Sequence, residues 1–241
     1  MFKSVQLLYN EVRHYFEGEF NYRMAKMKDF KQRLYYLGLS IVINSAGNAL
    51  AISSNLGSAV WTGSAVNLSK WVNVPLGTTL AIYGIIVTLS NQLLLGSFDR
   101  RRFFSNLLFT VPFSYLVAFF TLIFNSLGVP ALDFYIRLLL DIIGLYCVAM
   151  AVSMYSRANL IMHPNDDLAY IIRFKYIHGS AVISQWLSYI PPIVIIISSY
   201  LVTGKLYAIG FGTIFALTFQ GSMMKWSDTH AFPKLKHHVD L

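Results

Sequence analysis

The chain has 241 residues, of which 56% are hydrophobic and 12% are charged, and its formal net charge is +8. The charged fraction is half the roughly 25% of soluble domains, and the apolar residues gather in runs of about twenty, enough to cross a hydrocarbon core of roughly 30 Å. A soluble fold is therefore excluded, and we predict an all-α polytopic membrane protein. Nucleic acid is not an expected partner, because the basic residues flank the apolar runs instead of forming a patch.

Residues 1–33 predict a cytoplasmic arm. Apolar residues recur at helical spacing from Phe2 to Phe16, and four basic residues follow between Lys26 and Arg33. This pattern is typical of an interfacial helix followed by a basic anchor. An arm that binds a partner protein is the alternative.

The first predicted span, 34–53, carries Asn44 and Asn48 on one helix face, since they are four residues apart. Unpaired amides are costly in lipid, so this face is expected to point into the protein, where the amides bond between helices or bind a ligand. Residues 55–75 are too polar to span, yet Trp61 and Trp71 belong to one apolar face. We expect an amphipathic helix there, either interfacial or re-entrant.

The remaining predicted spans are 76–96, 103–125, 134–156, 181–201 and 206–224. A second amphipathic helix is expected at 167–177. In the span at 181–201, Pro191 and Pro192 remove two backbone donors, so the helix must kink or break there. A short basic tail, 227–241, ends the chain.

The basic residues predict the orientation. With a cytoplasmic N-terminus and six spans, 16 of the 19 Lys and Arg residues fall on the cytoplasmic side, and only Lys70, Arg137 and Lys205 fall on or near the other side. This split satisfies the positive-inside rule. The sequence therefore predicts a plasma-membrane protein with both termini in the cytoplasm.

The two halves of the chain, 34–125 and 126–226, resemble each other. A shift of 104 positions places the Asn-Leu pair at 55–56 on the Asn-Leu pair at 159–160. Each half contains a span, a polar break with an amphipathic helix, and two more spans. Because three spans are an odd number, similar halves enter the membrane from opposite sides. We therefore predict six transmembrane helices in two inverted three-helix repeats, an arrangement typical of transporters.

Two short motifs carry a resemblance to a known family. They are Pro164-Asn-Asp-Asp-Leu168 at the second break and Gly210-Phe-Gly-Thr213 in the last span. On these motifs, residues 34–226 resemble the YczE-like family of bacterial integral membrane proteins, which is related to the YitT group. The first break departs from the family pattern, with Val60 where proline is expected and Thr62 where an acidic residue is common. The resemblance implies a six-span membrane bundle and no particular substrate.

Asp166 and Asp167 follow a proline and precede the second amphipathic helix. An acidic residue at a helix start accepts backbone N–H groups and complements the helix dipole, so capping is one interpretation. The functional interpretation is that the carboxylate of Asp166 binds a cation, a proton or a basic group of a solute.

Asp133, Arg137 and Asp141 are spaced four apart on one face of the fourth span. Charges inside a membrane usually pair and face the protein interior, so we expect Arg137 to pair with one of the acids. Either the pair is structural, or Asp141 binds a coupling ion or substrate. In the second case Asp141→Asn abolishes activity while the protein still folds.

Gln185 lies just before the proline pair of the fifth span and is a further candidate for the lining of a cavity. No metal-ligand spacing, nucleotide loop or nucleophile motif is present in the sequence, so we expect neither a cofactor, nor a bound metal, nor enzymatic catalysis. The candidate site residues are Asn44, Asn48, Arg137, Asp141, Asp166 and Gln185.

The sequence thus predicts a small-solute permease or exporter with its site between two inverted repeats. The expected partners are the lipid bilayer, a small-molecule solute and possible further copies of the chain. The alternative is an accessory or scaffold protein that acts through its arm or through residues 157–180. A permease should bring its polar residues to a central wet cavity, whereas an accessory protein should bury them against one another.

Overall fold

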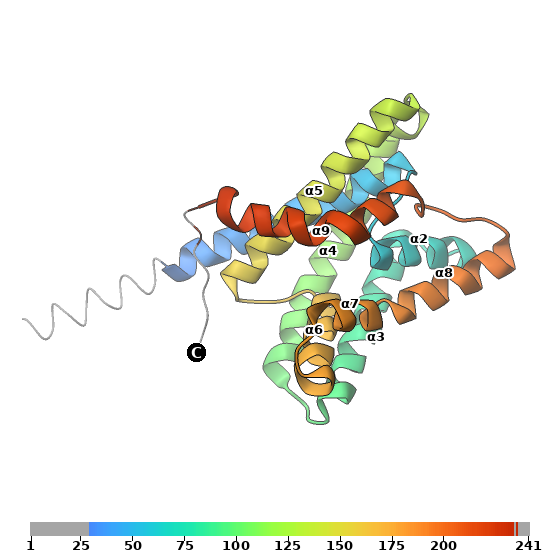
Figure 1. Ribbon diagram of the computed structural model, residues 1–241. Helices are drawn as coiled ribbons and strands as arrows, with labels where there is room; N and C mark the ends of the chain where they lie inside the picture. The colour runs from blue at the N-terminus through green and yellow to red at the C-terminus, as the bar shows by residue number, and fades with distance from the viewer. Residues whose placement is uncertain (1–28, 234, 236–241) are drawn as a thin grey trace, which may run out of the picture.

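The computed structural model describes residues 29–233 and 235, and this part of the chain is helical without strands (Figure 1). The predicted arm, apart from its last five residues, and the end of the predicted tail lie outside the described residues. Within these described residues, five helices are long and apolar enough to cross a membrane: Asp29–Ser54, α3 (Leu76–Leu95), α4 (Arg100–Ser126), α5 (Phe134–Ala158) and the nearly continuous pair Ala181–Thr203.

The sixth predicted span has different bounds. Helix α9 runs from Phe211 to His230, later than the expected 206–224, and its second half carries Lys225 and Asp228. It is therefore not among the helices that are apolar enough to cross a membrane. It lies along α5 (Figure 1).

The predicted breaks are present. The first contains α2 (Val60–Val72), and the second contains α6 (Pro164–Ile171) followed by a π-helical segment, η2 (Ile172–Ile177). The expected break at the proline pair is confirmed, since α7 (Ala181–Ser188) ends there and α8 (Ile190–Thr203) begins with the two prolines in its first turn. That position tolerates proline because the first N–H groups of a helix have no intrahelical acceptor. A short 3₁₀ turn, η1 (Val129–Ala131), joins α4 to α5.

The helices of the two halves end in matching ways. The first helix is followed by Asn55 with φ of 53°, and α5 is followed by Asn159 with φ of 47°. Asparagine is one of the few residues that adopt this left-handed conformation readily. The matching left-handed residues in chain order are Asn55 and Asn159, Asn73 and His178, and Gly96 and Gly204. The similarity of the halves therefore extends to backbone geometry at three successive helix ends.

The two halves also contact each other in a reciprocal way. Helix α2 of the first half packs on α8 of the second, and α6 of the second half packs on α3 of the first (Figure 1). Between them the first helix crosses α5 at Gly47 and Gly144. A Cβ on Gly47 would lie 2.6 Å from the Gly144 carbonyl oxygen, and one on Gly144 would lie 2.7 Å from the Gly47 oxygen. Only glycine allows so close a crossing, as in other membrane helix pairs.

The polarity of the surface is the reverse of that of a soluble protein. On α3 the exposed side chains include Ile82, Ile86 and Leu93, the last 81% exposed, while Thr88 and Asn91 are completely buried. Helices α4 and α8 likewise expose large apolar residues. Contiguous exposed apolar surface of this extent is rare on soluble monomers and suits contact with lipid. The described helices thus form a membrane-protein bundle.

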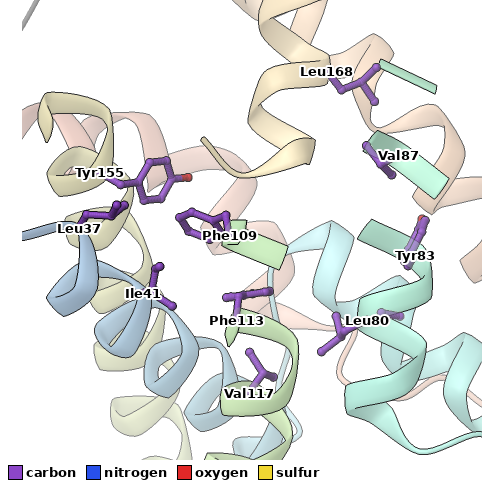
Figure 2. Packing of buried hydrophobic residues seen from close by; sticks show 11 residues of the cluster. Leu37, Ile41, Leu80, Tyr83, Val87, Phe109, Phe113, Val117, Tyr155 and Leu168 are labelled. Carbon is purple, nitrogen blue, oxygen red and sulfur yellow. The ribbon is translucent and has the colours of Figure 1, made fainter. Parts of the chain in front are cut away.

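A cluster of buried apolar side chains joins the two halves. It combines residues of the first helix, α3 and α4 with Tyr155 of α5 and Leu168 of α6. Figure 2 shows the Tyr155 ring beside Leu37 and Phe109, and the ring centroids of Tyr155 and Phe109 lie 5.0 Å apart. This cluster fixes the start of the second break against α3 and α4.

Candidate functional site

A cavity of about 650 Å³ lies between the two halves. This volume falls within the range of about 300–1,000 Å³ that is typical of small-molecule sites. Side chains from the first helix, α2, α3, α4, α5, α6, α7 and α9 line it. The polar lining residues used below are Asn44, Asn48, Thr62, Tyr83, Tyr155, His163, Asn165, Asp166, Gln185 and Tyr189.

The wall from the first half is a chain of hydrogen bonds. The Asn48 side-chain amide donates to the Asn44 side-chain oxygen at 2.8 Å, and the Thr62 hydroxyl donates to the Asn48 side-chain oxygen at 2.7 Å. The first helix and α2 are thereby joined at the cavity surface. The predicted inward face of the first span is confirmed, since Asn44 and Asn48 are 4% and 3% exposed.

The wall from the second half contains Asp166. The Tyr155 hydroxyl of α5 donates a hydrogen bond to the Asp166 carboxylate. The hydrogen-bonding part of the capping interpretation is wrong for Asp166, because the preceding residue His163 provides the cap: its Nδ1 accepts from the backbone N–H of Asn165 at 3.2 Å. Asp166 and Asp167 do lie in the first turn of α6, where acidic residues complement the helix dipole. The Asp166 side chain is thus directed to the cavity and α5 rather than to the helix end.

The neighbouring Asp167 has a different role. It is buried, accepts a hydrogen bond from the Asn106 amide at 2.9 Å, and lies 3.5 Å from the Arg102 guanidinium. Asn91 also donates to the Pro164 carbonyl at 2.9 Å. These contacts attach the start of α6 to α3 and α4.

Burial determines the charge states around Asp166. It raises the pKa of the Asp166 carboxyl to about 6, and the adjacent Asp167 charge adds to this rise, while the Tyr155 hydrogen bond lowers the pKa in part. Burial lowers the pKa of His163 to about 3, so that imidazole is neutral at physiological pH. Burial raises the pKa of Asp167 too, but its charge is compensated by Arg102.

The lining includes pairs of positions that the predicted repeat makes equivalent. Shifted by 104 positions, Asn44 falls on Val148, Asn48 on Val152, Trp61 on Asn165 and Thr62 on Asp166, and all eight residues line the cavity. The cavity therefore lies where equivalent positions of the two halves face each other. Its two walls are chemically unlike, because amides on one side match valines on the other.

Aromatic rings form much of the remaining lining. The rings of Trp61 and Tyr83 lie 5.4 Å apart, those of Phe113 and His163 lie 4.9 Å apart, and those of Trp186 and Tyr189 lie 6.3 Å apart. All six residues line the cavity.

The sequence model of a family of unknown function (DUF6198) matches residues 31–229. The chain belongs to this family. No curated protein and no solved structure matches the chain. The residues that line the cavity all lie inside the matched region, so the site belongs to the DUF6198 part of the chain. The match does not connect the chain specifically to YczE-like or YitT-related proteins, and that resemblance stays a prediction.

Two predicted site residues of this DUF6198 chain do not line the cavity. Asp141 is completely buried near the start of α9, where its Oδ1 accepts from the Ser54 hydroxyl at 3.0 Å. Within the described residues its Oδ2 has no hydrogen-bond partner. Arg137 donates to the backbone oxygens of Ser54 and Leu132, both at 3.1 Å. The expected ion pair of Arg137 with Asp133 or Asp141 is absent from the described part of the chain.

The remaining candidates, Asn44, Asn48, Asp166 and Gln185, all line the cavity. Sequence reasoning missed the contributions of Tyr155 and Thr62. The shift of 104 places Thr62 on Asp166, so the repeat carried the signal for Thr62. Nothing in the local sequence marks Tyr155. Among the described residues, no three His, Cys, Asp or Glu side chains lie close enough together to hold a metal ion.

Proposed function

We propose that the protein is a small-solute permease whose binding site is the cavity between the two halves. One observation carries this proposal: equivalent positions of the two halves, 104 residues apart, line a single cavity of about 650 Å³. In transporters built from internal repeats, the solute site lies between the repeats and next to interrupted helices. Helices α2 and α6 lie in such interruptions and both contribute to the lining.

The proposal includes the inverted topology. Helix α9, which packs along α5, is taken as the sixth span, so that each half has three. The charge split of 16 to 3 supports cytoplasmic termini in the plasma membrane. The matching left-handed helix ends and the reciprocal packing of α2 on α8 and α6 on α3 support related halves. The protein moves its solute without catalysis or a cofactor, and its exposed apolar faces suit lipid or further copies of the chain.

The hydrogen-bonded chain of Asn44, Asn48 and Thr62 is also compatible with an accessory protein that buries its polar groups against one another. Transport differs from this alternative in requiring the cavity to be occupied. Flux is therefore the measurement that separates the two functions.

The test uses the full-length protein reconstituted into liposomes and assayed for uptake and efflux across a library of small metabolites. Val152→Phe fills the cavity, and Val111→Phe, on an exposed face of α4, is the matched control. We expect flux of particular solutes with the wild type and with Val111→Phe, and its loss with Val152→Phe. The permease proposal fails if no solute crosses faster than in empty liposomes, or if Val152→Phe transports normally.

A further inference from the structure

The charges at the cavity wall have one sign. Asp166 is the only formally charged side chain among the described residues that line the cavity, which include no lysine and no arginine. The charge of Asp167 is offset by Arg102 at 3.5 Å, whereas no ion pair involves Asp166 in the described part of the chain. An ionised Asp166 therefore gives the cavity a net negative potential, which favours a cation and disfavours an anion.

The Asp166 carboxylate retains capacity for a ligand. Its Oδ2 accepts the hydrogen bond from Tyr155, while no described residue donates to its Oδ1. The side chain is half-buried and its accessible part belongs to the cavity lining. A carboxylate can accept several hydrogen bonds, so Oδ1 can receive a donor or contact a positive charge.

The aromatic lining suits the same kind of ligand. Tyr155 and Tyr189 line the cavity together with Asp166, and the Tyr155 hydroxyl donates a hydrogen bond to the Asp166 carboxylate. Trp61, Tyr83 and Trp186 add further ring faces. Aromatic faces attract cations through their quadrupole, and quaternary ammonium groups are commonly bound in this way.

From this arrangement we propose that the cavity binds small organic cations, with an ammonium group held between Asp166 and the aromatic rings. That such a cation is also the transported solute rests on the proposed function. Binding itself can be measured without transport, so the two proposals can fail separately.

The experiment measures binding to purified full-length protein by isothermal titration calorimetry. The probes are choline, its uncharged isostere 3,3-dimethylbutan-1-ol, and the anion 3,3-dimethylbutanoate, which share a bulky trimethyl head group and differ in charge. We expect choline to bind at least tenfold more tightly than either of the other two. Asp166→Asn should abolish this preference, because it removes the charge and keeps the volume. Asp133→Asn, at an exposed acid outside the cavity, is the matched control and should retain the preference.

A second measurement uses the wild type alone and stands even if Asp166→Asn does not fold. Choline keeps its charge at every pH, so a change in its affinity reports on the protein. The charged or titratable groups around Asp166 are Tyr155, Tyr189, His163, Asp167 and Arg102. Since the pKa of Asp166 is about 6 and that of His163 about 3, choline affinity should be highest above pH 6 and fall as the pH is lowered through it.

Equal binding of choline and its uncharged isostere, no binding of choline, or an unchanged preference in Asp166→Asn overturns the proposal. A choline affinity that stays constant as the pH is lowered from about 7.5 to below the ordinary carboxyl pKa of about 4 also contradicts it, since protonation of Asp166 must remove the charge that holds the cation. Specific binding of choline without flux in liposomes supports the cation site and contradicts the permease. Flux of an anionic solute through a protein that does not bind choline supports the permease and contradicts the cation site.

Discussion

The carboxyl group of Asp141 is enclosed where the first break meets the start of α9. A Cβ on Gly212 would lie 2.0 Å from its Oδ2 and 2.7 Å from the Gly57 carbonyl oxygen, so these two acceptors lie on the same side of Gly212. A buried acceptor without a partner costs about 1–3 kcal/mol. Asp141 therefore contributes to the junction of the halves rather than to the cavity wall.

Asp141→Asn should raise the stability of the protein. The substitution keeps the volume and the oxygen that accepts from Ser54, and it places an amide N–H₂ where the carboxylate has a partnerless oxygen close to the Gly57 carbonyl. We expect a gain of about 1 kcal/mol, seen as a higher melting temperature in detergent. A lower melting temperature would show that the charge itself is needed at this position.

The same variant decides between two assignments of the site. The sequence-based hypothesis has Asp141→Asn abolish activity, whereas the cavity geometry gives that effect to Asp166→Asn. Flux measured in both variants distinguishes them.

Gly212→Ala should destabilise the protein. Its methyl group would meet the Asp141 carboxylate and the Gly57 carbonyl, and overpacking of this kind costs about 1–3 kcal/mol or more. Gly221→Ala in the same helix is the control, because a Cβ there meets nothing within 4 Å, and it should be neutral or gain up to about 1 kcal/mol in helix propensity. Thermal unfolding of the two variants side by side measures the difference; equal melting temperatures would contradict the close contact.

For individual side chains, the sequence predicted which residues face the protein interior better than it predicted their hydrogen-bond partners. The spacing of Asn44 and Asn48 defines a helix face, and insertion costs direct that face into the protein. The spacing of Arg137 and Asp141 defines a face equally well. That spacing cannot indicate that the Arg137 guanidinium donates to the carbonyl oxygens of Ser54 and Leu132 and not to an acidic side chain.

Arg157 connects the ends of two elements, α5 and α9. It is 1% exposed, pairs with Asp228 at 3.9 Å, and donates to the Ala231, Leu235 and Phe232 carbonyls at 2.8, 3.0 and 3.3 Å. The last carbonyls of a helix have no intrahelical donors. One buried guanidinium thus satisfies the end of α9 and the turn that follows it.

Arg157→Met should release the end of α9 from α5. The substitution keeps the apolar stem but leaves several carbonyls without donors, at about 1–3 kcal/mol for each one that stays buried. We expect faster hydrogen exchange at residues 225–233 and a lower melting temperature. Lys225→Met, at an exposed position of α9, is the control and should change neither. Unchanged exchange in Arg157→Met would show that α5 and α9 are held together elsewhere.

Helix boundaries were predicted accurately where residues that start or stop helices, such as proline and glycine, lie at the ends. Helix α3 matches the predicted 76–96 within one residue, because Pro75 and Gly96 mark its two ends. Helix α9 starts at Phe211 instead of 206, since residues 204–210 form an irregular segment tied to the first break by hydrogen bonds from Ser58 to Ala208 and from Gly212 to Leu56. Such long-range contacts have no local sequence signal.

The topology of the whole molecule can be tested with single cysteines. The native Cys147 is first replaced by alanine, and cysteines are placed next to Lys70, Lys205, Arg101 and Asp228. An impermeant reagent added outside intact cells should label the first two positions and not the others. Labelling at the Asp228 position together with Lys205 would show that α9 does not cross the membrane. Labelling at the Arg101 position would show that the orientation is the opposite of the predicted one.

The predicted repeat rests on only two identities in the shifted segments at 55–56 and 159–160, together with the order of apolar spans and breaks. The order of apolar spans and breaks survives divergence because lipid constrains it. The chemistry of the cavity wall has no such constraint. Positions related by the predicted repeat do line the cavity, while the contributions of Tyr155 and the aromatic rings could be recognised only from the fold.

If the protein is the proposed permease and its halves exchange shapes during transport, the chemical difference between the two cavity walls has an energetic consequence. If the two halves were identical, the inward-facing and outward-facing forms would be related by a two-fold axis and would have equal energy. Asn44 and Asn48 correspond to Val148 and Val152 in the shift of 104 positions, so in the proposed permease the two forms would differ in energy and the empty protein would have a preferred orientation. Val152→Asn makes the walls more alike and should bring the two populations closer together. Comparing cysteine accessibility from the two sides of oriented vesicles measures this, and an unchanged ratio would mean that the resting orientation is set outside the cavity.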